Sequence, residues 1–123
     1  MRDLLKKIKK ANFYDLKAIG EFEDKKLCTL EDSKNFNYKE TKLFKELNKL
    51  DENRLDYVIV YILTGRELSR YYGTTLKIKF TEYVDYFNEC DIINKNHKLE
   101  KIKYVCFKSQ KLNNYIDTVL KYI

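Results

Sequence analysis

The chain contains no proline and only three glycines among its 123 residues. Average usage of about 5% and about 7% would give roughly six prolines and nine glycines. Proline breaks helices, and glycine is the residue that most readily adopts the positive φ of tight turns. A sequence so poor in both predicts helices that are joined by polar loops rather than by tight turns.

Length and hydropathy predict one folded domain, residues 1–123. Hydrophobic residues make up 44% of the chain and aromatic residues 15%, which excludes disorder over the whole length. No uninterrupted apolar run approaches the ~18 residues of a membrane span, and the first residues contain no apolar signal core. We therefore expect a cytoplasmic protein with no membrane segment and no membrane partner.

The net charge is +6, with 25 lysines and arginines against 19 acidic residues. A basic balance favours partners rich in phosphate or in acidic side chains, because it attracts them over a long range. Lysine is also encoded by A/T-rich codons, as are asparagine, isoleucine, tyrosine and phenylalanine. Base composition therefore explains part of the excess, and the positions of the lysines are more informative than their number.

Residues that could supply catalysis or hold a metal are few and scattered. Cys28, Cys90 and Cys106 lack the close pairing of zinc sites, so we expect three free thiols. His97 is the only histidine, and no motif places a nucleophile or a carboxylate beside it. No phosphate-binding loop and no nucleophile elbow occurs. The sequence predicts a non-enzymatic protein with no cofactor and no metal.

Hydrophobic periodicity predicts most of the elements. Apolar residues recur at helical steps in segments 3–10, 39–50, 53–63, 66–72 and 109–123. Segment 53–63 is apolar nearly all round, which is typical of a central buried helix. The lysines of residues 2–10 indicate a solvated outer face that covers the core. Residues 13–30 fit two structures: an extension of the first helix by residues 16–19, or a hairpin that pairs 18–22 with 26–30.

Two segments show strand-like patterns. Leu76, Ile78 and Phe80 alternate with lysines, as in a half-buried strand, although a helix entering from Lys77 fits the same residues. Segment 92–107, with a polar tip between apolar ends, is typical of a β-hairpin. We therefore predict an α+β, helix-dominated fold, in which a helical core bears a small antiparallel β-hairpin. Its parts are an N-terminal extension over 1–50, a central unit over 53–107 and a C-terminal helix over 109–123.

The central unit, residues 53–107, resembles a winged helix-turn-helix domain. Segments 53–63 and 67–73 match its first two helices, segment 83–93 resembles the end of its third helix, and the hairpin resembles its wing. The resemblance covers under half of the chain. It implies that the third helix enters the major groove of DNA while the wing contacts adjacent phosphates.

This resemblance and the charge pattern indicate candidate nucleic-acid-binding residues. They are Thr74, Thr75, Lys77 and Lys79 at the groove, and Lys95, His97, Lys98, Lys101 and Lys103 on the wing. Segment 95–111 alone has six lysines and one acid. For duplex DNA to bind, the two stretches must form one continuous positive surface. A Lys95/Lys98/Lys101 triple alanine variant should then stay folded and lose affinity.

The second hypothesis is a protein–protein interaction inhibitor from a phage or mobile element, one that blocks a host enzyme or defence nuclease. It rests on small size, A/T-rich composition and the lack of motifs, and exposed tyrosines suit such an interface. Candidate partner-binding residues are Arg66, Arg70, Tyr71, Tyr72, Tyr83 and Tyr86. The partner is double-stranded DNA under the first hypothesis, with a role as regulator or replication accessory. It is an acidic host protein under the second, and a homodimer stays open under both.

Overall fold

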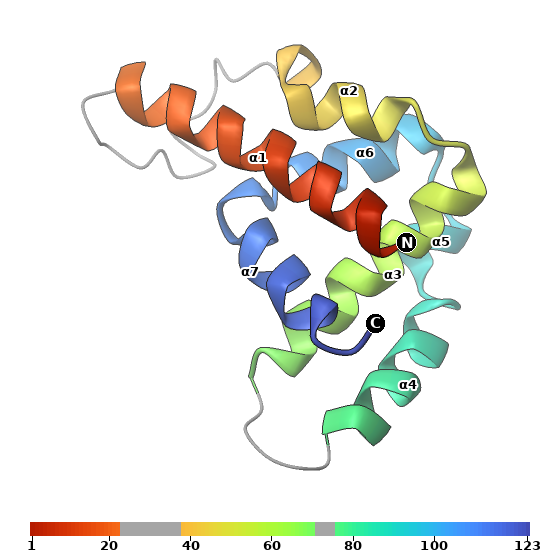
Figure 1. Ribbon diagram of the computed structural model, residues 1–123. Coiled ribbons are helices and arrows are strands. Elements are labelled where there is room, and N and C mark those ends of the chain that lie inside the picture. The colour runs from red at the N-terminus through yellow and green to blue at the C-terminus, as the bar shows by residue number, and fades with distance from the viewer. Residues whose placement is uncertain (23–37, 71–75) are drawn as a thin grey trace.

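The computed structural model describes residues 1–22, 38–70 and 76–123, and over these ranges the chain is helical with no strand. The elements are α1 (Arg2–Phe22), the 3-10 helix η1 (Tyr38–Glu40), α2 (Lys42–Asn48), α3 (Glu52–Leu68), α4 (Leu76–Phe87), α5 (Asp91–Asn94), α6 (Lys98–Cys106) and α7 (Ser109–Leu120). Figure 1 shows α3 in the middle of the bundle, with the two ends of the chain near each other.

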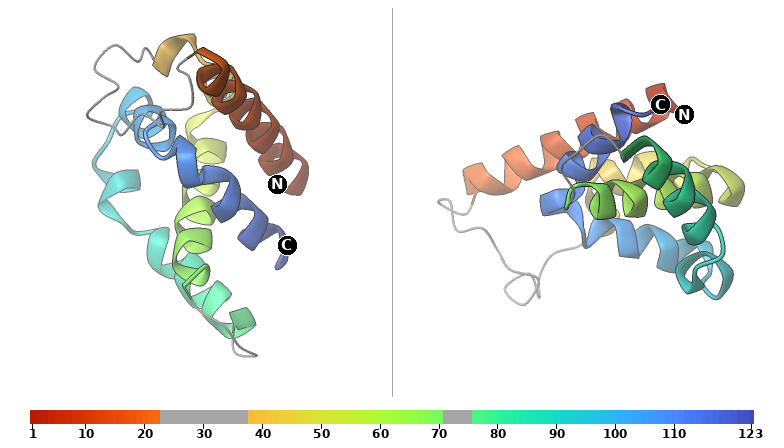
Figure 2. Two further views of the ribbon diagram at one scale, coloured as in Figure 1. Left: turned by 90° about the vertical axis from the view of Figure 1, so that its left-hand side faces the viewer. Right: turned by 90° about the horizontal axis from the view of Figure 1, so that it is seen from below.

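Helix α3 is the centre around which the other helices pack. Helices α7, α4 and α6 contact it directly, and α1 packs on α7 and α2 at the outside (Figure 2). The apolar residues of α3 that were expected in the core are all buried: Leu55, Val58, Ile59, Ile62 and Leu63. The predicted central helix is confirmed. Burial on several sides explains why its apolar residues follow no single stripe.

Polar contacts hold α1 against its two neighbours. The fully buried Asn12 donates its side-chain amide to the backbone oxygen of Ser109 on α7, at 2.8 Å. Asp15 accepts hydrogen bonds from the backbone N–H groups of Lys42 (3.0 Å) and Leu43 (2.9 Å). These N–H groups begin α2, where a negative charge is stabilising. Because both side chains face inward, the opposite side of α1 is directed to solvent.

The predicted β-hairpin is absent, and the α+β fold class is wrong. Residues 92–107 lie instead in α5, a short break and α6, so the described chain is a helical protein without a wing. Inside α6, Ile102, Val105 and Cys106 are buried at steps of three and one. This spacing puts all three on one side of a helix, whereas a strand would divide them between two faces.

Segment 76–80 is helical as well, so its interpretation as a strand is wrong. The alternative, a helix that enters near Lys77, is confirmed, because α4 begins at Leu76. The helix continues an apolar pattern in which Phe80, Val84 and Phe87 face the core. The alternation of apolar residues with lysines ends at Phe80. After Phe80 the residues that pack toward the core follow at helical steps of four and three.

The predicted break after residue 63 is also wrong, because α3 continues to Leu68. The hydroxyl of Thr64 donates to the backbone oxygen of Val60 at 2.8 Å, so this polar group is satisfied within the helix. Gly65 does not end the helix; it lies where α7 approaches α3 closely. Residues 53–68 therefore lie in one helix, with no turn between residues 63 and 67.

Two other predictions lie partly outside the described residues. α1 reaches Phe22, which confirms that residues 16–19 extend the first helix. Segment 26–30, the other half of the alternative hairpin, is not among the described residues. Neither are residues 71–75, which hold the end of the predicted helix 66–72.

Candidate functional site

Lys101, one of the expected phosphate-binding residues, lies inside the protein. Its side chain is 3% exposed, and its Nζ is 2.7 Å from Oδ1 of Asp56 and 3.6 Å from Oε2 of Glu52. Both acids belong to α3, so Lys101 joins α6 to the central helix. This position is not on the outer surface that contact with a phosphate requires.

The other lysines of this region make separate contacts over α5 and α6. The Nζ of Lys95 is 3.5 Å from Oδ1 of Asp91, and Lys98 donates to a backbone oxygen at the end of α2 at 3.0 Å. The Nζ of Lys103 lies 5.6 Å from the ring centroid of Phe107. These lysines remain partly accessible, but they do not converge on one place.

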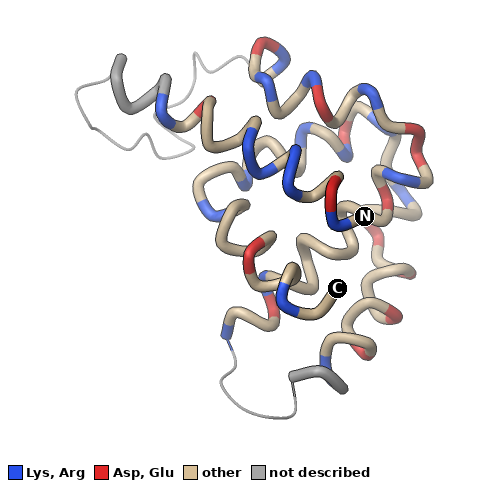
Figure 3. The backbone as a smooth tube through the Cα atoms, in the orientation of Figure 1, with Lys and Arg blue, Asp and Glu red and all other residues tan. Residues whose placement is uncertain are grey.

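Of the side chains expected at the groove, the structure describes that of Lys79 alone. Thr74 and Thr75 lie outside the described residues, as does the side chain of Lys77. Lys79 is half-buried near the start of α4, and His97 is exposed in the break before α6. Figure 3 shows the acidic positions of α4 between its first turn and α5. Among the described residues, acidic positions therefore lie along the chain between Lys79 and the lysines of α5 and α6.

Three of the expected partner-binding residues meet around Phe87, a buried residue of α4. The ring of Tyr86 makes an edge contact with it at 5.1 Å and 77°, and the ring of Tyr83 lies at 6.1 Å. The guanidinium carbon of Arg66, on α3, is 6.0 Å from the same ring. Tyr83 and Arg66 are half-buried, whereas Tyr86 projects into solvent.

Of the rest of the expected partner-binding set, the structure describes Arg70 alone. Arg66 forms an ion pair with Glu67 at 3.1 Å, and the exposed Arg70 lies 3.6 Å from the same carboxylate. Tyr71 and Tyr72 are outside the described residues. The structure thus brings together Arg66, Tyr83 and Tyr86 and adds the buried Phe87, which was not among the expected partner-binding residues.

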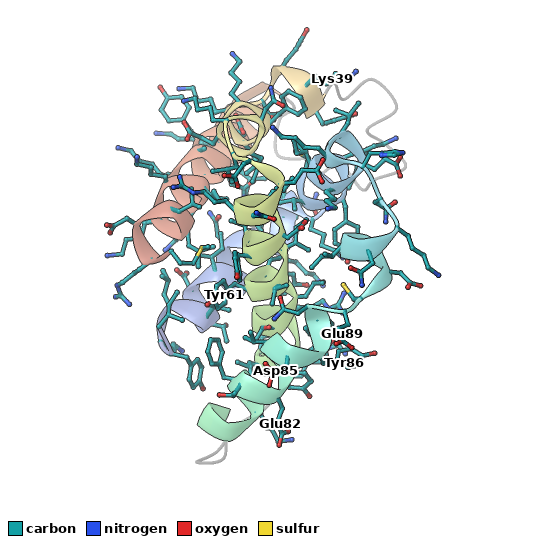
Figure 4. The ribbon with its side chains drawn as sticks, turned by 90° about the vertical axis from the view of Figure 1, so that its right-hand side faces the viewer. Lys39, Tyr61, Glu82, Asp85, Tyr86 and Glu89 are labelled. Carbon is teal, nitrogen blue, oxygen red and sulfur yellow. The ribbon has the colours of Figure 1, made fainter. Side chains whose placement is uncertain are left out.

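Three carboxylates flank Tyr86 on the outer side of α4 and the turn that follows it. Glu82, Asp85 and Glu89 recur at steps of three and four, so they project in similar directions (Figure 4). All three are exposed, and none forms an ion pair with a described cation. We call Glu82, Asp85, Tyr86 and Glu89 the α4 face. It is a negative patch on a chain whose net charge is +6.

A groove of about 470 Å³ lies beside α6 and is open to solvent. Its lining consists of Ile92, Asn96, Glu100, Lys103, Tyr104, Phe107 and Lys108.

No group of three or more histidine, cysteine or acidic side chains is arranged to bind a metal ion within the part of the chain that the structure describes. Among the described helices, none combines the length and the apolar composition that crossing a bilayer requires.

The two described cysteines should differ in reactivity. Cys90 is half-buried and Cys106 is buried, and both are free thiols, while Cys28 lies outside the described residues. Burial, and then the nearby charge of Asp15, raises the pKa of the Cys106 thiol to about 12, although a hydrogen bond with Thr41 acts in the other direction. In a Cys28→Ser variant, Ellman's reagent at about pH 8 should modify Cys90 and leave Cys106 intact until unfolding, because little thiolate forms. Rapid loss of both thiols in the native protein would contradict this.

No protein-family model matches this chain, and comparisons with curated proteins and with solved structures find no significant similarity. The geometry and the charge of the described surfaces are therefore the features that bear on what this chain binds.

Proposed function

We propose that this protein is a non-enzymatic protein-binding module whose α4 face docks onto a basic surface of a partner protein. The main support is the position of Tyr86, which is 70% exposed on a helix whose other side packs into the core. A tyrosine on a rigid element favours binding because it buries a large ring and loses little conformational freedom.

Contact with Phe87 supports the idea that Tyr86 is already ordered before binding. Edge-to-face packing at 5.1 Å is a favourable arrangement of two aromatic rings. Phe87 is itself held by burial and by the stacked ring of Tyr83. A side chain that is held in one orientation in the free protein loses less entropy when a partner immobilises it.

The carboxylates of the α4 face suggest the charge of the partner. Solvated charges at the edge of an interface act mainly on the association rate and on orientation, and a basic surface complements them. An acidic partner, which the net charge of +6 favours, would be repelled at this face. Enzymes that act on nucleic acids present basic surfaces of the required kind. We therefore keep a host enzyme or defence nuclease as the proposed class of partner.

Tyr86→Ala is expected to weaken partner binding by about 30-fold or more while the melting temperature stays unchanged. A tagged chain would recover the partner from the cells that express it, and calorimetry with the purified partner would give the affinity. Tyr57→Ala is the matched control, since Tyr57 is an exposed tyrosine on α3, 53% accessible.

A second variant tests the charge of the α4 face by combining Glu82→Gln, Asp85→Asn and Glu89→Gln. It should associate with the partner more slowly, and its association rate should depend less on salt concentration.

A partner that binds the Tyr86→Ala and Tyr57→Ala variants equally well would contradict the proposal. So would a partner whose affinity rises when the three carboxylates are neutralised, because that partner would present an acidic surface.

A further inference from the structure

A row of cationic and aromatic side chains occupies the outer side of α1. Lys6, Lys10, Phe13 and Lys17 follow one another at steps of four, three and four, and all are exposed. Such steps align side chains along a helix, here over about 16 Å at ~1.5 Å per residue. Figure 3 shows basic positions along α1 and along the neighbouring α2.

The inner side of α1 fixes the direction of this row. Leu5 and Ile8 are fully buried in the core, and the buried Asn12 is bonded to the backbone of α7. Rotation of the helix would expose these apolar side chains and break that hydrogen bond. The row is therefore directed to solvent by the packing of the whole domain, not by the mobility of single side chains.

Tyr14 extends the row toward α2. Tyr14 is 58% exposed, and the Nζ of Lys42 lies 3.5 Å from its ring centroid, in a cation–π contact. The adjacent Phe13 is 62% exposed. We call this set the α1 face: Lys6, Lys10, Phe13, Tyr14, Lys17 and Lys42.

The four lysines of the α1 face form no ion pair with any described acid. Asp15, the acid that follows Tyr14, points to α2 and accepts hydrogen bonds from its backbone. Asp3, one turn before Lys6, is an exposed acid at the beginning of the helix. The α1 face thus has four lysine charges that no described acid neutralises by an ion pair.

Unpaired lysines beside exposed rings match the chemistry of single-stranded nucleic acid. Lysines neutralise phosphates, and aromatic rings stack on bases that are free of a partner strand. A duplex stacks its bases internally, so it would use the lysines and leave the two rings without a role. The cations here are lysines, which contact phosphates as point charges, rather than arginines, which recognise bases by paired hydrogen bonds.

We propose that the α1 face binds single-stranded nucleic acid, with its lysines on phosphates and with Phe13 and Tyr14 stacked on bases. The binding has little sequence preference, because every base offers a flat face. α3 and α7 lie between α1 and α4, so this surface is separate from the α4 face (Figure 2). The proposal holds whether or not a protein docks on α4.

The test uses a fluorescein-labelled oligo(dT) of about 20 nucleotides, whose anisotropy reports affinity over a series of salt concentrations. Lys6→Gln/Lys10→Gln/Lys17→Gln should reduce the slope of log affinity against log salt by about 2, since each phosphate contact adds about 0.7. Phe13→Ala/Tyr14→Ala should lower affinity about tenfold or more and leave the slope unchanged, because it removes stacking and no charge.

Two controls separate the α1 face from the general charge of the protein. Lys95→Gln/Lys111→Gln/Lys121→Gln removes three exposed lysines elsewhere and should lower the slope much less. Tyr86→Ala should leave oligo(dT) binding unchanged. A labelled duplex of equal length should bind more weakly, with an affinity that does not respond to loss of the two rings.

Three results would overturn the proposal. One is an equal loss of slope in the two triple lysine variants, which indicates diffuse charge. Another is an affinity unchanged by loss of Phe13 and Tyr14, which indicates a duplex-type phosphate contact. The third is binding to phosphatidylserine vesicles without binding to oligo(dT), which assigns the α1 face to a membrane surface. Circular dichroism of each variant verifies that these exposed substitutions leave the fold intact.

Discussion

Gly65→Ala is expected to destabilise the protein by about 3 kcal/mol. A Cβ at this position would overlap the backbone oxygen of Tyr115 and would lie 2.8 Å from Cγ2 of Val119. Both residues belong to α7, whose Ile116 and Val119 are fully buried against the core. The clash is with backbone, so no rotamer relieves it, and α3 and α7 must separate. On an exposed helix the same substitution would stabilise by about 1 kcal/mol.

Urea unfolding followed by circular dichroism measures this effect, with a corresponding fall in melting temperature of about 10 °C. Asn114→Ala is the control, because Asn114 is an exposed residue of α7 and its replacement should change stability by less than ~0.5 kcal/mol. If Gly65→Ala unfolds at the same urea concentration as the original protein, α3 and α7 are far enough apart at Gly65 to hold a methyl group.

The helical core could be predicted because its periodicity is strong and lies within single elements. Leu112, Ile116 and Val119 recur at helical steps in the last segment, and all three are buried. Leu5 and Ile8 show the same pattern near the start of the chain, where they are buried too. In such segments the local pattern and the tertiary packing favour the same structure, so the sequence alone is sufficient.

The region 92–107 could not be predicted in this way, since its apolar residues are compatible with two structures. Two apolar residues, Ile92 and Ile93, precede a polar stretch, and an apolar run then ends at Phe107. This pattern is as typical of a hairpin as of two short helices. The choice between the two structures depends on Asp56, which is distant in the sequence. Lys101 pairs with Asp56 of α3 and is buried there, and this pairing puts it on the same helical side as Ile102 and Val105.

For the candidate surfaces, the sequence indicated some of the residues but not how those residues contact one another. Tyr83, Tyr86 and Arg66 were identified by residue type, but the contact of all three with Phe87 requires α3 and α4 to pack together. On α1 the lysines were expected to form only a solvated cover. The exposure of Phe13 and Tyr14 could not be foreseen, because residues 13–30 had no assigned structure and an aromatic pair is as common in a core.

The structure leaves two separate faces of opposite charge on one small domain. The α4 face is acidic with a single exposed ring, and the α1 face is basic with two. Their separation by α3 and α7 allows both to be occupied at once, so a protein partner and a single strand need not compete. Net charge alone would have favoured one kind of partner for the whole surface, whereas binding depends on the local charge.

Asp56→Asn is expected to destabilise the protein by about 3 kcal/mol, because it leaves the Lys101 ammonium buried without its main partner. The Lys101 side chain is 3% exposed, and its ammonium would keep only Glu52, at 3.6 Å, whose side chain is 59% exposed. Lys101→Met should have a smaller effect, about 1.5 kcal/mol. Asp56 is 26% exposed and can return to water, while methionine fills the space of the lysine stem.

The double variant Asp56→Asn/Lys101→Met should therefore be more stable than Asp56→Asn alone, since it removes the isolated charge. Urea unfolding of the original protein, the two single variants and the double variant gives the coupling energy between Asp56 and Lys101. The control is Lys103→Met, at an exposed lysine of the same helix, which should change stability by less than ~0.5 kcal/mol.

A Lys95/Lys98/Lys101 triple alanine variant should lose stability for the same reason, through Lys101. A loss of nucleic-acid affinity in that variant would therefore report unfolding. Equal effects of Lys101→Met and Lys103→Met would instead show that the Lys101 ammonium is solvated, and would make it available to bind phosphate.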